Sequence, residues 1–160
     1  MRKLPYREGT WFAVPLRRGG FGVGIVARAG RKGKTIFAYF FGPKRLAVPL
    51  LAQVKALKPR SAVLKIRVGD LALVRGTWPI IGCSESWDRS EWPMPAFIQR
   101  EPLGRGRAWR VRYSEDDLNV VVAEEPVDPQ TTGLEDGLDG AGSAEIILTK
   151  LLTEGQVGAS

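Results

Sequence analysis

The chain has 160 residues, of which 44% are hydrophobic and 26% charged, a composition typical of a folded globular domain and unlike disordered or fibrous chains. The net charge of +7 is uneven: residues 1–112 carry 23 Lys or Arg against six acids (+17), and residues 113–160 carry one Lys against eleven acids (−10). Apolar runs are too short for a bilayer, the N-terminus lacks a signal-peptide pattern, and the single Cys83 excludes an internal disulfide. We therefore expect a cytoplasmic protein without a membrane segment.

The first part of the chain has the pattern of an antiparallel meander. Three apolar runs alternate with two Gly-containing turns: 10–16, 19–20, 21–29, 30–33 and 35–41. Glycine supplies the positive φ angles that tight hairpin turns require, so this pattern predicts three consecutive strands.

A short helix is predicted after the third strand. The residues that share its apolar face are Leu46, Leu50, Leu51, Val54 and Leu57. Their spacing is helical, and Pro59 is expected to end the helix. Beyond it, the apolar residues 71–74 are predicted as a further strand.

Three more strands are predicted at 97–100, 109–113 and 119–123. The fold class is therefore mainly β (α+β): a small twisted antiparallel sheet or partly open barrel of about six to eight strands, one short helix after the third strand and a C-terminal helix.

The chain is expected to divide into three parts. A β-rich core domain covers residues 1–124, and an acidic Gly/Asp-rich linker covers 125–142, because that stretch is poor in apolar residues and should be mobile. A C-terminal helix is expected at 143–155, with Ser143 as its N-cap.

The residue types argue against an enzyme. The chain has no histidine, which removes the commonest general base and metal ligand, and one cysteine cannot build a structural zinc site. We expect no catalytic residues, no metal and no cofactor. A catalytic carboxylate pair is the remaining route to chemistry, and nothing in the sequence brings its candidates together: Asp88, Glu91, Asp116 and Asp117.

The tryptophans are the more informative residues. Trp78, Trp87 and Trp92 fall within fifteen positions, in a region stiffened by three prolines. Rigid aromatic side chains dominate many binding interfaces, so this loop is a candidate contact surface. For Trp78, a place in the core beneath the loop is the favoured interpretation.

Four stretches in this order resemble a known family. They are 9–16 (GTWFAVPL), 21–26 (FGVGIV), 76–82 (GTWPIIG) and 92–97 (WPMPAF). Together they are similar to the immunity protein 26 family of bacterial polymorphic toxin systems, over about residues 8–124. The resemblance implies a β-rich domain that binds and neutralises a cognate toxin, encoded nearby, by stoichiometric protein–protein association. It carries over no binding residues.

Candidate contact residues combine the tryptophan loop with the first acids of the C-terminal region. They are Trp87, Asp88, Glu91, Trp92, Glu115, Asp116 and Asp117. The core is basic, whereas immunity proteins against nucleases are commonly acidic, so a nuclease partner would require the segment from Glu115 onward to mask its site.

Nucleic-acid binding by a small basic β-barrel is the alternative function. The cations that would contact phosphates are Arg17, Arg18, Arg31, Lys32, Lys34, Arg105, Arg107, Arg110 and Arg112. The aromatic residues that would stack on bases are Phe21, Phe37, Tyr39 and Trp109.

Overall fold

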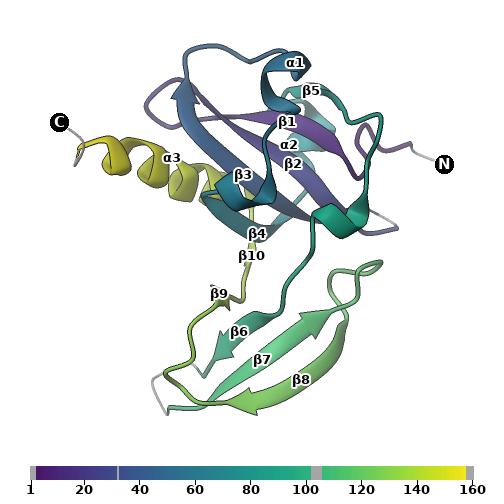
Figure 1. Cartoon of the computed structure of the whole chain (residues 1–160), viewed down its shortest axis with the longest axis vertical. Coiled ribbons are helices and arrows are strands. Elements are labelled where there is room, and N and C mark those ends of the chain that lie inside the picture. The colour runs from purple at the N-terminus through teal and green to yellow at the C-terminus, as the bar shows by residue number, and fades with distance from the viewer. Residues whose placement is uncertain (1–2, 32, 102–105, 158–160) are drawn as a thin grey trace.

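A computed structural model describes residues 3–31, 33–101 and 106–157 of the chain (Figure 1). It confirms the predicted class, a mainly β fold of the α+β type. The described residues form ten strands in two mixed sheets, and neither sheet closes into a barrel. The strand count and the second sheet go beyond the prediction.

The larger sheet has six strands in the order β10-β4-β3-β2-β1-β5. Its strands are β1 (Thr10–Pro15), β2 (Phe21–Ala29), β3 (Thr35–Arg45), β4 (Leu64–Gly69), β5 (Ile80–Cys83) and β10 (Leu138–Asp139). The predicted meander is present, since β1 pairs with β2 and β2 with β3, both antiparallel. Strand β10 joins parallel to β4 and places Leu138 beside Arg67.

The smaller sheet has four strands in the order β8-β7-β6-β9, and it lies below the larger one in Figure 1. Its strands are β6 (Phe97–Arg100), β7 (Ala108–Tyr113), β8 (Val121–Val127) and β9 (Leu134–Glu135). These strands form a separate sheet and do not extend an edge of the larger one. Their apolar side chains pack on one face of the larger sheet. The rings of Phe37 and Phe97, for example, have centroids 5.8 Å apart.

The helices differ from the predictions in two places. They are α1 (Leu51–Val54), η1 (Pro59–Ser61), α2 (Leu71–Arg75), η2 (Arg89–Glu91) and α3 (Ala141–Val157). The predicted helix over 46–57 is reduced to the single turn α1, with Pro49 just before it. The predicted strand 71–74 is wrong: it forms α2, which ends at Gly76 in the left-handed conformation.

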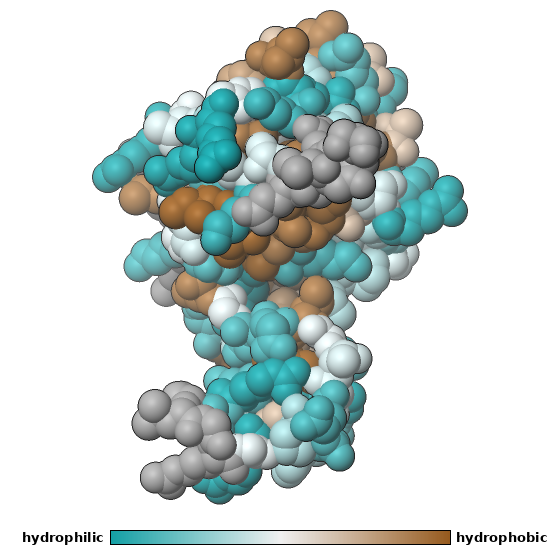
Figure 2. Space-filling view, turned by 90° about the vertical axis from the view of Figure 1, so that its left-hand side faces the viewer, coloured by the Kyte–Doolittle hydropathy of each residue, from teal (hydrophilic) through white to brown (hydrophobic). Residues whose placement is uncertain are grey.

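Two apolar cores cover the two faces of the larger sheet. The first contains Phe12, Trp78 and Leu148 and lies under α2 and α3. The second contains Tyr39, Trp92 and residues of the smaller sheet. Trp78 is fully buried and stacks on Phe12, which confirms its predicted place in the core. On the face in Figure 2, apolar surface gathers over the upper part of the molecule, and the smaller sheet below is mostly hydrophilic.

The acidic stretch 125–142 contains the end of β8 and all of β9 and β10, so it pairs with both sheets. Helix α3 begins at Ala141, and the prediction of Ser143 as its N-cap is wrong. The Ser143 hydroxyl lies 2.9 Å from Asp139 Oδ1, in the first turn. The division into core, linker and helix stays a prediction.

Acids after residue 113 neutralise cations of the core. Residues 9–69 contain 13 Lys or Arg and no acid. Within the described ranges, three of these cations form ion pairs with later acids: Arg17–Glu145 (3.1 Å), Arg28–Glu115 (2.8 Å) and Arg67–Asp136 (3.1 Å). The charge asymmetry of the sequence is thus partly compensated within the fold.

Candidate functional site

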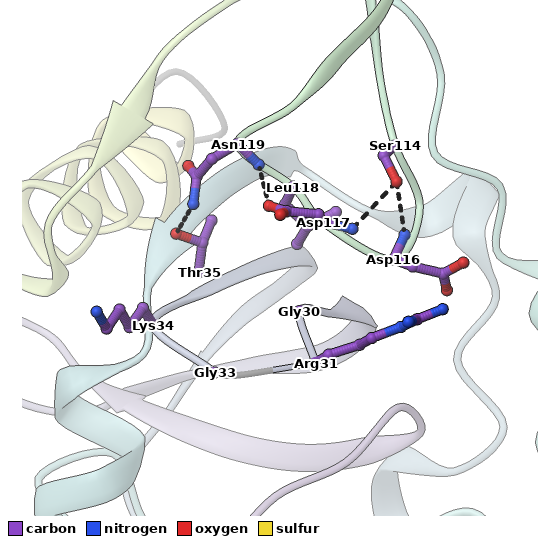
Figure 3. A pocket seen from close by; sticks show the side chains of 10 residues that line it. All are labelled: Gly30, Arg31, Gly33, Lys34, Thr35, Ser114, Asp116, Asp117, Leu118 and Asn119. Carbon is purple, nitrogen blue, oxygen red and sulfur yellow. Dashed lines mark hydrogen bonds between the residues drawn. The ribbon is translucent and has the colours of Figure 1, made fainter.

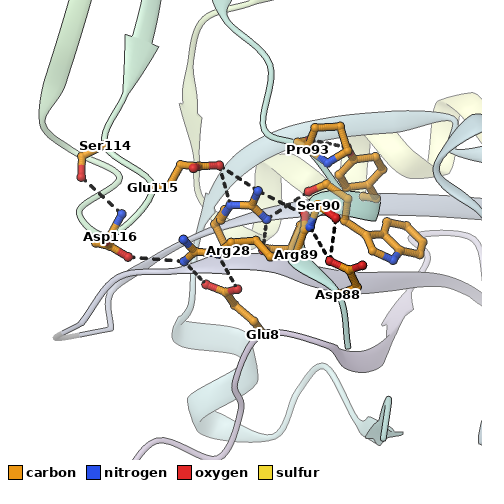
Figure 4. Close-up of polar contacts among 12 residues, drawn as sticks. Glu8, Arg28, Asp88, Arg89, Ser90, Pro93, Ser114, Glu115 and Asp116 are labelled. Atoms are coloured by element: carbon orange, nitrogen blue, oxygen red, sulfur yellow. Dashed lines mark hydrogen bonds and ion pairs between the residues drawn. The ribbon is translucent and has the colours of Figure 1, made fainter. Parts of the chain in front are cut away.

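The two segments that carry the predicted contact residues, 87–92 and 114–117, lie side by side in the structure (Figure 4). Two arginines join them. Arg28 projects from β2 and Arg89 belongs to η2, and both bond to acids of the turn between β7 and β8. All seven predicted residues therefore belong to one region of the molecule.

Arg28 is the buried centre of this region, with only 3% of its side chain exposed. Its Nε and Nη2 atoms donate to Glu115 Oε1 at 2.9 and 2.8 Å. Nη1 donates to the carbonyls of Ala27 and Trp92, and Nη2 to that of Arg89. A buried guanidinium satisfied in this way fixes the three segments that it touches.

Arg89 forms a second bridge, from the start of the chain to the β7–β8 turn. It donates two hydrogen bonds to the Glu8 carboxylate, at 3.0 and 2.6 Å, and one to Asp116 Oδ1 at 3.3 Å. Burial raises the pKa of Glu8, but hydrogen bonds from Arg89 and Trp87 outweigh it, so this pKa lies below its ordinary value. The hydrogen bonds from Arg89 to Glu8 raise the pKa of Arg89.

The two tryptophans of the loop have different roles. Trp92 is 6% exposed and packs edge-on against Trp11 and Tyr39. Trp87 is half-buried, stacks on Trp92 with ring centroids 6.0 Å apart, and donates from Nε1 to Glu8 Oε1. Trp92 therefore supports the surface from below, and Trp87 reaches it.

Besides Glu115, which is paired with Arg28, four acids are exposed in this region, and we call them the acidic rim: Asp88, Glu91, Asp116 and Asp117. Asp88 accepts bonds from the backbone and hydroxyl of Ser90, which lower its pKa. Asp117 Oδ1 accepts from the backbone of Asn119 at 3.3 Å. No side-chain bond involves Glu91 within the described ranges 3–31, 33–101 and 106–157.

A polar hollow of about 530 Å³ lies next to the rim, between the β2–β3 and β7–β8 turns (Figure 3). Its lining residues are Gly30, Arg31, Gly33, Lys34, Thr35, Ser114, Asp116, Asp117, Leu118 and Asn119. The two turns touch directly: Arg31 donates its N–H to the Asp116 carbonyl, and Asn119 Nδ2 donates to Thr35 Oγ1 at 3.3 Å. The cations Arg31 and Lys34 line the wall formed by the β2–β3 turn, and the carboxylates of Asp116 and Asp117 line the wall formed by the β7–β8 turn.

The sequence reading missed Glu8, Arg28 and Arg89. A signal was present for Arg28, because this charged residue stands inside the apolar stretch 23–29 that becomes β2. Arginine is almost never fully buried unless it is paired, so an arginine within a strand buried on both faces indicates an internal ion pair. Its partner Glu115, 87 positions later, stands in a polar turn, where nothing in the sequence marks it as the partner of a buried arginine.

Some residues of the nucleic-acid alternative are buried or ion-paired. Phe37 and Tyr39 are fully buried and offer no face for stacking. Arg107 is paired with Glu101, and Arg110 with Glu125. Lys32 and Arg105 lie outside the described residues.

The described part of the chain holds neither a candidate metal cluster nor a membrane-spanning helix. No three Cys, Asp or Glu side chains come close enough there to hold a metal ion. No helix in that part has the length and apolar character needed to cross a bilayer.

Comparison with known proteins identifies the family. The family model of immunity protein 26 matches residues 7–109, which run from the segment before β1 into β7. No curated protein and no solved structure matches the chain. The match covers the tryptophan loop, Arg28 and Arg89, and ends before Glu115, Asp116 and Asp117. The chain belongs to the immunity protein 26 family.

Proposed function

We propose that this chain binds one toxin domain of a bacterial polymorphic toxin system and neutralises it by stoichiometric association, without a catalytic step. The observation that carries the proposal is the family match over residues 7–109. We further propose that the two proteins meet in the cytoplasm and that the toxin is encoded next to this protein.

The acidic rim and Trp87 are the proposed contact surface. Asp88, Glu91, Asp116 and Asp117 project from two segments that the buried Arg28 holds together. Such a rigid surface loses little entropy on binding, which favours tight association. Its charge selects a toxin surface rich in Lys and Arg, and Trp87 adds an aromatic contact beside it.

The remaining polar groups of the region support a binding role rather than a reactive one. The Glu8 carboxylate receives two hydrogen bonds from Arg89, and Glu115 receives two from Arg28. Arginine stabilises the Glu8 carboxylate as an anion and holds its pKa below the ordinary value, so this group is a poor proton donor and acceptor near neutral pH.

Co-expression with the protein encoded next to this gene tests the proposal. We expect that protein to arrest growth alone, and the wild-type chain to restore growth. Failure of the wild-type chain to protect against a toxic neighbour would exclude the neutralising function.

A charge-reversed pair of variants tests the contact surface. Glu91→Lys places a cation in the rim, and we expect it to weaken the complex by about tenfold or more. Glu85→Lys changes the net charge equally, at an exposed turn position outside the rim, and should bind as the wild type does. Equal affinity of both variants would exclude the rim as the contact.

A further inference from the structure

Strand β8 is an exposed edge of the smaller sheet. It pairs antiparallel with β7 and is the terminal strand in the order β8-β7-β6-β9. In Figure 1 it is the outermost strand of the lower sheet. An edge strand directs every second N–H and C=O group away from its neighbour, where an added strand can bond to them.

The first half of this edge is apolar and open on both of its faces. The exposed fractions of Val120, Val121 and Val122 are 47%, 45% and 62%. Natural edge strands are usually protected by charged residues, proline or a covering element. Here the charged residues and the proline, Glu124, Glu125 and Pro126, stand in the second half of β8. In the first half, the register with β7 shifts once, between the pairs Tyr113–Val121 and Arg112–Ala123.

A second copy of this chain is a poor occupant of the edge. Two β8 strands paired antiparallel about their central residue would place one Glu124 directly opposite the other. Like charges in that position destabilise a strand pair. Glu125 already has a partner in Arg110, at 2.7 Å, whereas Glu124 forms no ion pair with any residue of the described ranges.

We propose that β8 receives an extended segment of the toxin by β-strand addition, with apolar side chains against Val120–Val122 and a Lys or Arg against Glu124. The inference rests on the proposed function and names a second part of its surface. Asp116 and Asp117 of the acidic rim precede β8 in the same hairpin, so one partner can reach both the rim and the edge.

The pairing register shows which backbone groups face the open side. Pro126 lies opposite Trp109 and has no N–H, so this position does not donate to β7. Glu124, opposite Val111, stands two residues before it and shares its orientation because strand geometry alternates. The N–H of Glu124 therefore points toward the added strand.

A pair of variants in the full chain separates backbone addition from charge. Glu124→Ala removes the carboxylate and keeps the N–H, whereas Glu124→Pro removes both. Proline is tolerated at edges, and thermal unfolding will show that both variants fold. The probe is an inactivated form of the toxin encoded beside this gene. We expect Glu124→Pro to bind it about tenfold or more weakly than Glu124→Ala.

Hydrogen exchange on the wild-type complex gives a measurement that needs no variant. We expect exchange of the Glu124 amide to slow by at least about tenfold when the inactivated toxin is bound. An unchanged rate, or equal affinities of the two variants, overturns strand addition while growth protection by the wild type still supports neutralisation. If the wild type gives no protection, both proposals fall.

Discussion

Trp78 donates a hydrogen bond from its indole Nε1 to Glu145 Oε2, at 2.8 Å, and so ties the β-sheet core to helix α3. The same carboxylate forms an ion pair with Arg17 in the β1–β2 turn. Trp78 lies within the part of the chain that matches the family, and Glu145 lies beyond it. The C-terminal helix is therefore an integral part of this fold.

The apolar contacts of α3 should contribute strongly to stability. Leu148 is fully buried in the core under α3, and we expect Leu148→Ala to lower the free energy of unfolding by about 3 kcal/mol. Ile146 is about half exposed on the same helix, so Ile146→Ala should cost less than about 1 kcal/mol. Urea denaturation followed by tryptophan fluorescence measures both. Equal losses would show that α3 does not pack as described.

A strand glycine makes room for this helix. A Cβ atom at Gly22 would lie 2.6 Å from Leu148 Cδ2, so we expect Gly22→Ala to cost about 1–3 kcal/mol. The control is Gly137→Ala, because nothing lies within 4 Å of a Cβ atom there. Combined with Leu148→Ala, Gly22→Ala should cost less, since the shortest contact is gone and only the contact with Leu152 Cδ1 at 3.2 Å remains tight. Additive effects in this cycle would rule out the close contact.

The buried Arg28 beneath the acidic rim should matter more to stability than the arginine of a surface pair. Arg28→Met removes five hydrogen bonds from a buried position, and we expect a loss of about 3 kcal/mol. Arg110→Met breaks an exposed pair with Glu125 and should change stability by less than about 1 kcal/mol. Chemical denaturation at neutral pH distinguishes them, and a reversed order would argue against the role assigned to Arg28.

Acid should weaken the fold through Glu8. Its pKa in the folded chain lies below the ordinary value of 4.5, so its stabilising contribution is present above pH 4.5 and is lost as the pH falls through the folded pKa. We expect the wild type to lose more free energy of unfolding than Glu8→Gln does between about pH 6 and about pH 3. Parallel stability curves for the two proteins would exclude this contribution.

Local patterns in the sequence were enough to predict the meander and the closing helix. The Gly-containing turns and apolar runs over 10–41 specify β1, β2 and β3 because hairpin pairing is local. The strand prediction for 71–74 is wrong because four apolar residues do not distinguish a strand from a helical turn. Its end at Gly76 is the feature that marks it as a helix.

Long-range relationships could not be predicted in the same way. The parallel pairing of Leu138 with Arg67 joins residues that only the folded chain brings together. The region around Arg28 is similar: its predicted acids lie together, yet the arginines that assemble them were not recognised. Charge composition shows a basic first part and an acidic second part, and folding determines which cation meets which acid.

The most direct test of toxin neutralisation is a titration of the purified toxin with this chain. Toxin activity should fall in proportion to the chain added and reach zero at one equivalent, and light scattering should give the mass of a one-to-one complex. Activity that persists in excess chain, or that disappears at far less than one equivalent, would contradict neutralisation by stoichiometric binding.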